Sequence, residues 1–523
     1  MNAIAQPVAA AEIDVVELSI ADVHKGFAEG RFTSETLTLA FLERIGRYEP
    51  YYNAFTFMNP GALDDAKAAD ARRAAGSPIG PLDGLPVVIK EAMDFVGLPS
   101  TGGWAPLSSV AGGFDLFPER DAPVVTRLRQ AGAVILGKTN IPAFSHDGTR
   151  ANTSWDGPTF SAVNRAIAPG ASSSGTATAV AASFCVVGLA EETGGSIQNP
   201  GAAQSLVSVK PSFALVPNTG VMPLAGSTRD VVGPHAKSVV DAAMLLDVLA
   251  GYTPEDPKTV AAIGHVPRGG YASKLSTSAL SGARVGLYGA GWRTKPLSEE
   301  AQGLYDAAIA VVKARGAELV ADPFAGSGFS DLAAQNVEFD PRGMESIAFD
   351  LEHYLRRLGQ SAKASSFMTL RSLLTEDPFA PEGLLGIHPP QSPVLVKSLL
   401  DPTEPPDLAG FIAAKEAYLE VFNRVMDENR LDVLVFPQMA AELPGIFEAA
   451  QHPATTVSEI NIAGLPGVTV PAGQFANGSP FALILVGRMW SEAELLAFAY
   501  DYEQASRLRI VPELVETPYI AAT

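Results

Sequence analysis

Residues 168–197 of the chain read APGASSSGTATAVAASFCVVGLAEETGGSI, and this stretch decides how the whole sequence is interpreted. Two loops of very small residues, around Ser172 and around Ser196, flank a segment of small apolar residues. Small side chains let the backbone approach a ligand closely and let consecutive N–H groups converge on an anion. Each loop also carries a hydroxyl, which is a weak nucleophile until a base activates it. The remaining sequence must therefore supply a base.

A lysine is the best candidate for that base. None of the seven histidines lies in a recognisable triad context, and a Gly-x-Ser-x-Gly elbow is missing. A lysine can replace histidine where burial keeps its amine neutral. Lys90 follows the apolar run 85–89, which predicts a buried strand that ends at this lysine. Lys138 follows a similar run at 133–137, and we expect it to serve structure.

Strand-like and helix-like segments alternate along the chain. Further strands are predicted at 283–288, 317–321, 431–436, 467–471 and 481–486, and helices at 298–315, 408–429 and 491–506. This alternation predicts an α/β fold with a central mixed β-sheet covered by helices on both faces. We expect one catalytic domain over 1–523, with a helical N-terminal region at 1–75 and an inserted cap or lid at 324–407.

Composition and charge exclude several classes of partner. The 523 residues carry a formal net charge of −20, which would repel nucleic acid. Cys185 is the only cysteine, so an intramolecular disulfide is excluded, and the histidines show no metal-ligand spacing. The N-terminus does not resemble a signal peptide, and the run 177–190 is too short to span a bilayer. We expect a cytoplasmic enzyme with no metal, cofactor, nucleic-acid or membrane partner.

Together these segments resemble the amidase-signature hydrolases. That family has a strand ending in lysine, then a Gly/Ser-rich loop, then Thr-Gly-Gly-Ser-Ile. The chain matches with LPVVIK at 85–90, GASSSGT at 170–176 and TGGSI at 193–197. Further similar segments are GKTN at 137–140, VKPS at 209–212, VGP at 232–234 and AGLPGVTVPAG at 463–473. The resemblance extends along nearly the whole chain and implies the amidase-signature fold.

The resemblance also implies roles for particular residues. Ser196 would be the nucleophile, Ser172 would follow a cis peptide bond and relay protons, and Lys90 would be the terminal base. The two serines are 24 residues apart, as in the family. The backbone N–H groups of the loop would form the oxyanion hole: Thr193, Gly194, Gly195 and Ser196. Residues expected to border the substrate are Ala171, Phe144, Trp155, Gln198 and Glu191.

Some positions differ from the family's commoner residues. Glu191 and Glu192 stand where Thr and Asp are usual, Gln198 stands where Arg is usual, and Ala92 replaces an Asn. Glu191 is expected to perturb the hydrogen bonds around the nucleophile. Gln198 removes a guanidinium that could bind a carboxylate through two hydrogen bonds. The expected substrate is therefore a neutral and rather apolar or aryl carboxamide.

Other functions remain open on the sequence alone. The same acyl-enzyme chemistry would serve an esterase or a carbamate-cleaving enzyme. A glutaminase subunit of a tRNA-dependent amidotransferase is a third interpretation, which needs a partner chain. A degenerate member used only for binding is disfavoured, because Lys90, Ser172 and Ser196 are all present. A phosphate loop is disfavoured because no Gly-Lys-Ser/Thr follows the glycines. A small-molecule substrate and a homodimer are the expected partners.

Overall fold

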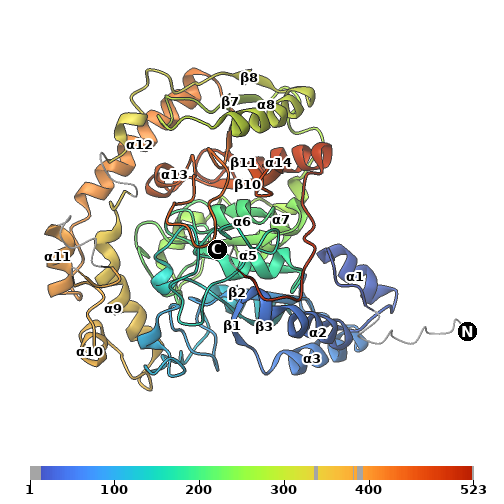
Figure 1. Ribbon diagram of the computed structural model, residues 1–523, viewed down its shortest axis with the longest axis vertical. Coiled ribbons are helices and arrows are strands. Elements are labelled where there is room, and N and C mark those ends of the chain that lie inside the picture. The colour runs from blue at the N-terminus through green and yellow to red at the C-terminus, as the bar shows by residue number, and fades with distance from the viewer. Residues whose placement is uncertain (1–12, 335–339, 381, 386–392, 521–523) are drawn as a thin grey trace, which may run out of the picture.

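The computed structural model describes residues 13–334, 340–380, 382–385 and 393–520. A single sheet of eleven strands runs through this part of the chain, in the order β1-β3-β2-β4-β6-β5-β10-β11-β9-β7-β8 (Figure 1). The strands are β1 (Phe55–Met58), β2 (Pro86–Lys90), β3 (Val134–Thr139), β4 (Val187–Glu192), β5 (Val207–Lys210), β6 (Val231–Ala236), β7 (Arg284–Leu287), β8 (Glu318–Val320), β9 (Val433–Pro437), β10 (Gly467–Gln474) and β11 (Pro480–Val486).

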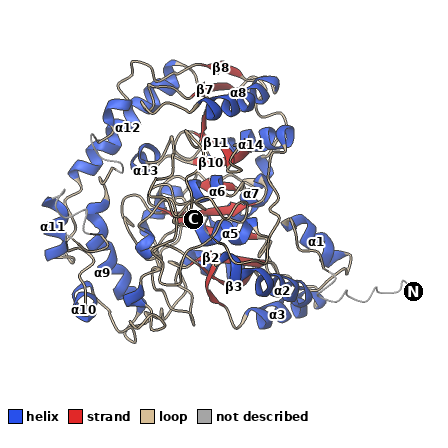
Figure 2. Cartoon of the chain, in the orientation of Figure 1, coloured by secondary structure: helices blue, strands red, loops and turns tan. Residues whose placement is uncertain are grey.

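The sheet is mixed. β2 pairs in parallel with β3 and β4, and β7 pairs in parallel with β8 and β9. The other neighbours are antiparallel: β1 with β3, β4 with β6, β6 with β5, and the series β5-β10-β11-β9. The predicted central mixed sheet with flanking helices is therefore confirmed (Figure 2).

Helices surround this sheet. They are α1 (Ile20–Ala28), α2 (Ser34–Tyr52), α3 (Ala62–Ala74), α4 (Pro123–Gln130), α5 (Ser174–Ala181), α6 (Gln198–Ala203), α7 (Val239–Leu249), α8 (Glu299–Ala314), α9 (Ile347–Leu358), α10 (Phe367–Leu373), α11 (Pro393–Leu400), α12 (Ala409–Glu428), α13 (Ser458–Ala463) and α14 (Glu492–Ser506). The predicted strands and helices from residue 283 onward correspond to β7, α8, β8, α12, β9, β10, β11 and α14.

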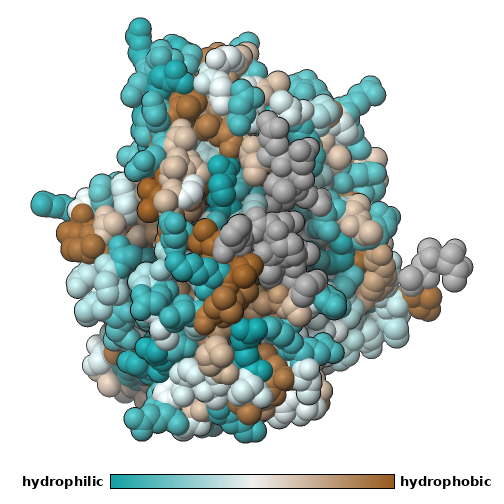
Figure 3. Space-filling model, turned by 90° about the vertical axis from the view of Figure 1, so that its left-hand side faces the viewer, coloured by the Kyte–Doolittle hydropathy of each residue, from teal (hydrophilic) through white to brown (hydrophobic). Residues whose placement is uncertain are grey.

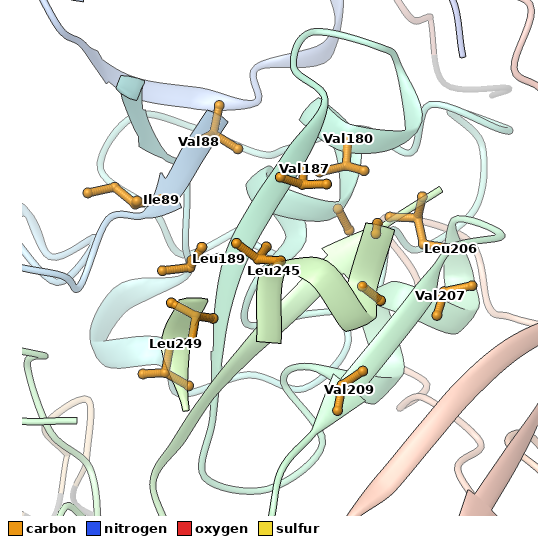
Figure 4. Close-up of a cluster of buried hydrophobic side chains, with 14 of the residues drawn as sticks. Val88, Ile89, Val180, Val187, Leu189, Leu206, Val207, Val209, Leu245 and Leu249 are labelled. Atoms are coloured by element: carbon orange, nitrogen blue, oxygen red, sulfur yellow. The ribbon is translucent and has the colours of Figure 1, made fainter. Parts of the chain in front are cut away.

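The core forms where apolar strand residues meet α5 and α7. Side chains of β2 and β4, such as Ile89 and Leu189, lie close to Leu245 and Leu249 of α7 (Figure 4). Gly188 in β4 is required by the close approach of α5, because a Cβ there would lie 2.6 Å from Thr176 Cγ2. The sheet and α5 thus hold the loops that precede α5 and follow β4 in fixed positions.

The regions outside this core have distinct positions. The N-terminal segment up to residue 75 contains α1, α2 and α3, and β1 joins the sheet beside β3. Within 324–407 the described helices include α9, α10 and α11, which lie with α12 on the left of the molecule in Figure 1. That side is mostly hydrophilic with scattered hydrophobic areas (Figure 3). No helix in the described ranges is long and apolar enough to cross a membrane.

Candidate active site

Lys90 is the last residue of β2, and its amino group is buried. The strand lies between β3 and β4, and the lysine has no exposed surface. Its Nζ atom lies 2.7 Å from Ser172 Oγ, 3.1 Å from the carbonyl oxygen of Glu191 and 2.5 Å from Glu191 Oε2. The fold thus brings three of the predicted site residues into direct contact.

Ser172 lies in the loop that leads into α5, and the peptide bond from Ala171 to Ser172 is cis, as expected. Gly170 has φ +70°, and a Cβ there would lie 2.5 Å from Pro200 Cα. Only a glycine fits this backbone conformation and this contact with α6. The Ala171 N–H donates to the carbonyl oxygen of Gly148 at 3.2 Å. Backbone contacts on both sides therefore fix the position of Ser172.

Ser173 connects this loop to the end of β4. Its hydroxyl donates to the carbonyl oxygen of Glu191 at 3.0 Å and accepts the N–H of Glu191 at 3.2 Å. The N–H of Ser173 donates to the carbonyl oxygen of Ser196 at 3.4 Å. The two serine-containing loops, far apart in sequence, are therefore joined directly.

Ser196 lies in the loop between β4 and α6 and is 5% exposed. Among the described residues its Oγ has no hydrogen-bond partner, so the structure shows no bond between Ser196 Oγ and Ser172 Oγ. The backbone N–H groups of Thr193, Gly194, Gly195 and Ser196 also have no acceptor within the described ranges. Buried N–H groups are nearly always paired. A run of unpaired donors beside a free hydroxyl suits the binding of a negatively charged oxygen.

The carboxylate of Glu192 binds the part of the chain that follows Ser196. Glu192 Oε2 accepts the N–H of Ile197 at 2.7 Å and that of Gln198 at 3.1 Å. Glu192 Oε1 accepts the side-chain amides of Gln198 at 2.6 Å and of Asn461 at 2.8 Å. The residue is buried, so these charge-assisted bonds replace water around its carboxylate.

Two more carboxylates lie behind the loop. The Thr193 hydroxyl lies 2.6 Å from Asp230 Oδ1, to which it donates, and 3.3 Å from Glu191 Oε1. Burial raises the pKa of Asp230 to about 7, and the negative charge of Glu191 contributes to the rise. Asp230 also accepts the N–H groups of Leu224 and Ala225. The loop is thus flanked by three buried carboxylates, of which Glu191 is the one in contact with Lys90.

Phe144 and Trp155 lie against the loop 101–104. Phe144 is buried, with its ring 5.2 Å from that of Trp104, and its N–H donates to the carbonyl oxygen of Gly102 at 2.6 Å. Trp155 is half-buried, and its indole N–H donates to Thr101 Oγ1 at 3.0 Å. Hydrogen bonds and ring contacts among the described residues do not join either aromatic ring to Ser172 or Ser196.

The side chain of Gln198 is engaged inside the protein. Besides its bond to Glu192, its Oε1 accepts the amide of Gln438 at 3.3 Å. Gln438 also reaches Asn199 Oδ1 at 3.4 Å, and Gln198 itself is 1% exposed. Gln198 therefore supports the loop that carries Ser196.

The contacts of Lys138 are structural. Its Nζ atom donates to the carbonyl oxygen of Pro99 at 2.7 Å and to Ser100 Oγ at 2.9 Å, and it lies 3.9 Å from Glu91 Oε1. Burial lowers the pKa of Lys138, although Glu91 and Asp94 oppose this effect. These contacts fix the loop after β2.

Sequence reasoning did not identify several residues around the site. His235 in β6 is buried, which lowers its pKa to about 4, and its Nε2–H donates to the carbonyl oxygen of Ile197 at 2.8 Å. Asp230 lies just before the VGP segment, but nothing in that motif shows which hydroxyl the carboxylate contacts. Gln438 and Asn461 come from distant parts of the chain.

The structure contains two cavities of note among the described residues. One of about 360 Å³ borders Asp230 and is lined by Asn218, Gly220, Lys258, Asp350 and Arg357, among others. A second, of about 520 Å³, is lined by Ala166, Glu442, Gly445, Gln451 and Pro453, among others. Within the described ranges, no group of three or more His, Cys, Asp or Glu side chains could hold a metal ion.

Comparisons with known proteins find relatives over nearly the whole chain. A family model described as Amidase matches residues 36–325. A probable amidase of Arabidopsis thaliana is 30% identical over 96% of this chain and 92% of its own length. One chain of the glutamyl-tRNA(Gln) amidotransferase of Cereibacter sphaeroides is 32% identical over 94% of this chain and 97% of its own.

A solved structure is similar over the same extent. The native peptide amidase of Stenotrophomonas maltophilia superposes with a TM-score of 0.76 at 29% identity, over 95% of this chain and 99% of that one. The matched segments include the strand that ends at Lys90 and both serine loops. The chain therefore belongs to the amidase-signature family and is a hydrolase that acts on carbon–nitrogen amide bonds.

Proposed function

We propose that the protein cleaves a neutral, rather apolar or aryl carboxamide through an acyl-enzyme on Ser196, with Ser172 as proton relay and Lys90 as base. The observation that carries this proposal is the 2.7 Å contact between Lys90 Nζ and Ser172 Oγ. It lies beside a buried loop whose N–H groups lack acceptors within the described part of the chain. A base, a relay hydroxyl, a free hydroxyl and anion-binding donors are the parts that acyl transfer requires.

The proposed reaction uses these groups one after another. Ser196 Oγ attacks the amide carbonyl carbon while its proton passes to Ser172 Oγ, and the Ser172 proton passes to neutral Lys90. The tetrahedral oxyanion is bound by the N–H groups of residues 193–196. When the carbon–nitrogen bond breaks, Ser172 returns a proton to the leaving nitrogen and regains one from Lys90. Water then attacks the acyl-enzyme through the same relay and releases the acid.

The preference for a neutral substrate rests on Gln198. A glutamine there cannot offer a guanidinium to a carboxylate, and its amide is already bonded to Glu192 and Gln438. Phe144, Trp155 and Ala171 are proposed to border the apolar part of the substrate. Peptide amidase is among the similar proteins, which supports a small-molecule amide as the substrate class.

A glutaminase role in a larger complex is the second candidate. The 32% identity to one chain of a glutamyl-tRNA(Gln) amidotransferase, over nearly the full length of both sequences, favours it. That role would require a partner chain and would leave the isolated protein weakly active on simple amides. Esterase or carbamate cleavage is also compatible with the same acyl-enzyme.

The segment 324–407 is proposed to act as a cap within a single catalytic domain. Its helix α9 binds the loop after β2, because Tyr354 donates to Asp94 Oδ1 at 2.9 Å and Arg357 forms a 3.1 Å ion pair with Asp94. At the other end of α9, Asp350 accepts the N–H of Ser227 at 3.0 Å. The cap thus touches the segment that leads to Asp230.

The proposal also covers the partners of the protein, its location and its assembly. The net charge of −20 supports the absence of a nucleic-acid partner. A cytoplasmic location and a homodimer are proposed with it, and analytical ultracentrifugation of the purified chain would test the dimer.

The deciding experiment measures product release from matched anilides, primary amides, esters and carbamates that share one acyl group. Ser196→Ala and Ser172→Ala should each lower kcat/KM by at least about 10²-fold. Ser174→Ala is the matched control, since Ser174 is the first residue of α5, close to Ser172 in sequence, and its buried Oγ has no hydrogen-bond partner among the described residues. Activity that survives Ser196→Ala would show that Ser196 is not the nucleophile. Activity on glutamine only after addition of a partner chain would favour the second candidate.

A further inference from the structure

Glu191 surrounds the amino group of Lys90 with two of its oxygen atoms. The Glu191 carbonyl oxygen lies 3.1 Å from Lys90 Nζ, and its Oε2 lies 2.5 Å away. Ser172 Oγ occupies the third contact at 2.7 Å. Both charged side chains are almost wholly buried, at 0% and 3% side-chain exposure. Water and dissolved ions therefore screen the attraction between Lys90 and Glu191 very little.

These contacts fix where the lysine lone pair points. A neutral amine has two N–H donors and one lone pair, whereas an ammonium has three donors. If the two Glu191 oxygens accept the two N–H groups, the lone pair can only face Ser172 Oγ. The same carboxylate also stabilises the protonated amine by direct charge attraction. Glu191 therefore orients the base and opposes its deprotonation.

Other charged groups near this pair are few within the described ranges. Asp230 is linked to Glu191 through the Thr193 hydroxyl, and His235 faces the site from β6. Glu192 turns toward Ile197 and Gln198 on the far side of the strand. On β3, Lys138 pairs with Glu91 and the loop after β2.

The helices α5 and α7 add no further charge to the pair. α5 carries no titratable side chain, and on α7 the carboxylates of Asp241 and Asp247 bind N–H groups of Ile20 and Tyr271. The amine of Lys90 thus faces one direct carboxylate partner, with a second carboxylate behind it.

We propose that Glu191 is a positioning residue that directs the Lys90 lone pair at Ser172 and sets the pH above which this lysine can act as the base. The inference rests on the proposed function, since it assigns Glu191 a role in that relay. It explains a glutamate at a position where the family more often has a residue without charge.

The test compares the pH profile of kcat/KM in wild type, Glu191→Gln and Glu91→Gln. Glutamine keeps an oxygen acceptor but removes the charge, so the acidic limb should move to lower pH by about 1–3 units. Glu91→Gln is the matched control. Glu91 follows Lys90 in the sequence and is also buried, but its carboxylate faces Lys138 and Thr101. Its limb should stay within a few tenths of a unit of wild type. An unmoved limb in Glu191→Gln overturns the inference.

A second readout does not need turnover. Lysine labelled with ¹³C at Cε reports the charge of Lys90 by NMR, with the signal assigned by Lys90→Met. The Lys90 signal should titrate at lower pH in Glu191→Gln than in wild type, and an identical titration in both proteins overturns the inference. Labelling of Ser196 by a fluorophosphonate, read by mass spectrometry, tests the proposed function separately. Absence of labelling and of activity at every pH rejects that function, while the lysine titration still decides the role of Glu191.

Discussion

The carboxylate of Glu192 accepts the backbone N–H of Ile197 at 2.7 Å, and this bond closes the loop that carries Ser196. The loop runs from the end of β4 to the start of α6, and Glu192 spans it by binding the N–H of Gln198 as well. Gly195, within the loop, has φ +98°, a conformation that other residues rarely adopt. The free N–H groups therefore keep one orientation because a buried carboxylate and a glycine hold the turn.

Glu192→Gln should lower kcat more than it changes KM. Glutamine can accept one of these N–H groups but loses the charge-assisted bonds, so the loop donors would no longer be held for the transition state. We expect kcat to fall about 10- to 100-fold, corresponding to about 1.4–2.8 kcal/mol of barrier. Glu428→Gln at the exposed end of α12 is the control and should behave as wild type. Equal kcat values in both variants would contradict this role of Glu192.

Lys90→Met should abolish activity and also destabilise the fold. Removal of the lysine leaves the Glu191 carboxylate buried without its cation, which typically costs about 3–5 kcal/mol. The double variant Lys90→Met/Glu191→Leu removes both charges and should regain much of that stability while remaining inactive. Urea unfolding and amide turnover measure the two effects independently. A double variant as unstable as the single one would show that the ion pair is not the cause.

Asp230 should make stability depend on pH. Its pKa is raised from 3.8 to about 7, chiefly by burial and then by the charge of Glu191. A raised carboxyl pKa favours the fold when the group is protonated, so this stability is complete below pH 3.8 and is lost as the pH rises through about 7. Asp230→Asn mimics the protonated form. Between about pH 5 and pH 7 the free energy of unfolding should fall less in Asp230→Asn than in wild type. Above about pH 8 the difference between the two proteins should stay constant.

Much of the fold could be predicted from the sequence, because apolar runs with clear boundaries mark many of the strands. β2 and β3 each follow this pattern and end near a lysine. β4 could not be predicted, since residues 177–190 form one mostly apolar run in which a single serine is the polar residue between α5 and the strand. The turn between them lies at Ser183, which has φ +54° without being a glycine. Nothing in its residue type signals that conformation.

The site was predictable only in part, for a related reason. Local motifs indicated Lys90, Ser172 and Ser196 as a set, and the structure places Lys90 against Ser172. Motifs do not show which carboxylate faces the lysine, since Lys90 and Glu191 are 101 residues apart. Contacts such as Glu192 with Asn461, 269 residues apart, depend on the packing of α13 against the loop. Long-range pairing of this kind follows from the topology of the sheet and not from local sequence.

A matched pair of glycine substitutions tests whether α5 holds the site. Gly188→Ala places a methyl group 2.6 Å from Thr176 Cγ2 of α5 and 3.0 Å from Val88 Cγ2 and Val180 Cγ2, so α5 must shift. Overpacking of this kind typically costs about 1–3 kcal/mol.

The shift should also reach Ser172, because the loop that carries it runs directly into α5, and we expect kcat to fall about 10-fold at unchanged KM. Gly303→Ala in α8 is the control, since nothing lies within 4 Å of its added Cβ. That change should raise stability by up to about 1 kcal/mol, through the higher helix propensity of alanine, and leave kcat alone. Urea unfolding and amide turnover would be measured for both. A Gly188→Ala variant that loses stability but keeps full kcat would show that the site tolerates movement of α5.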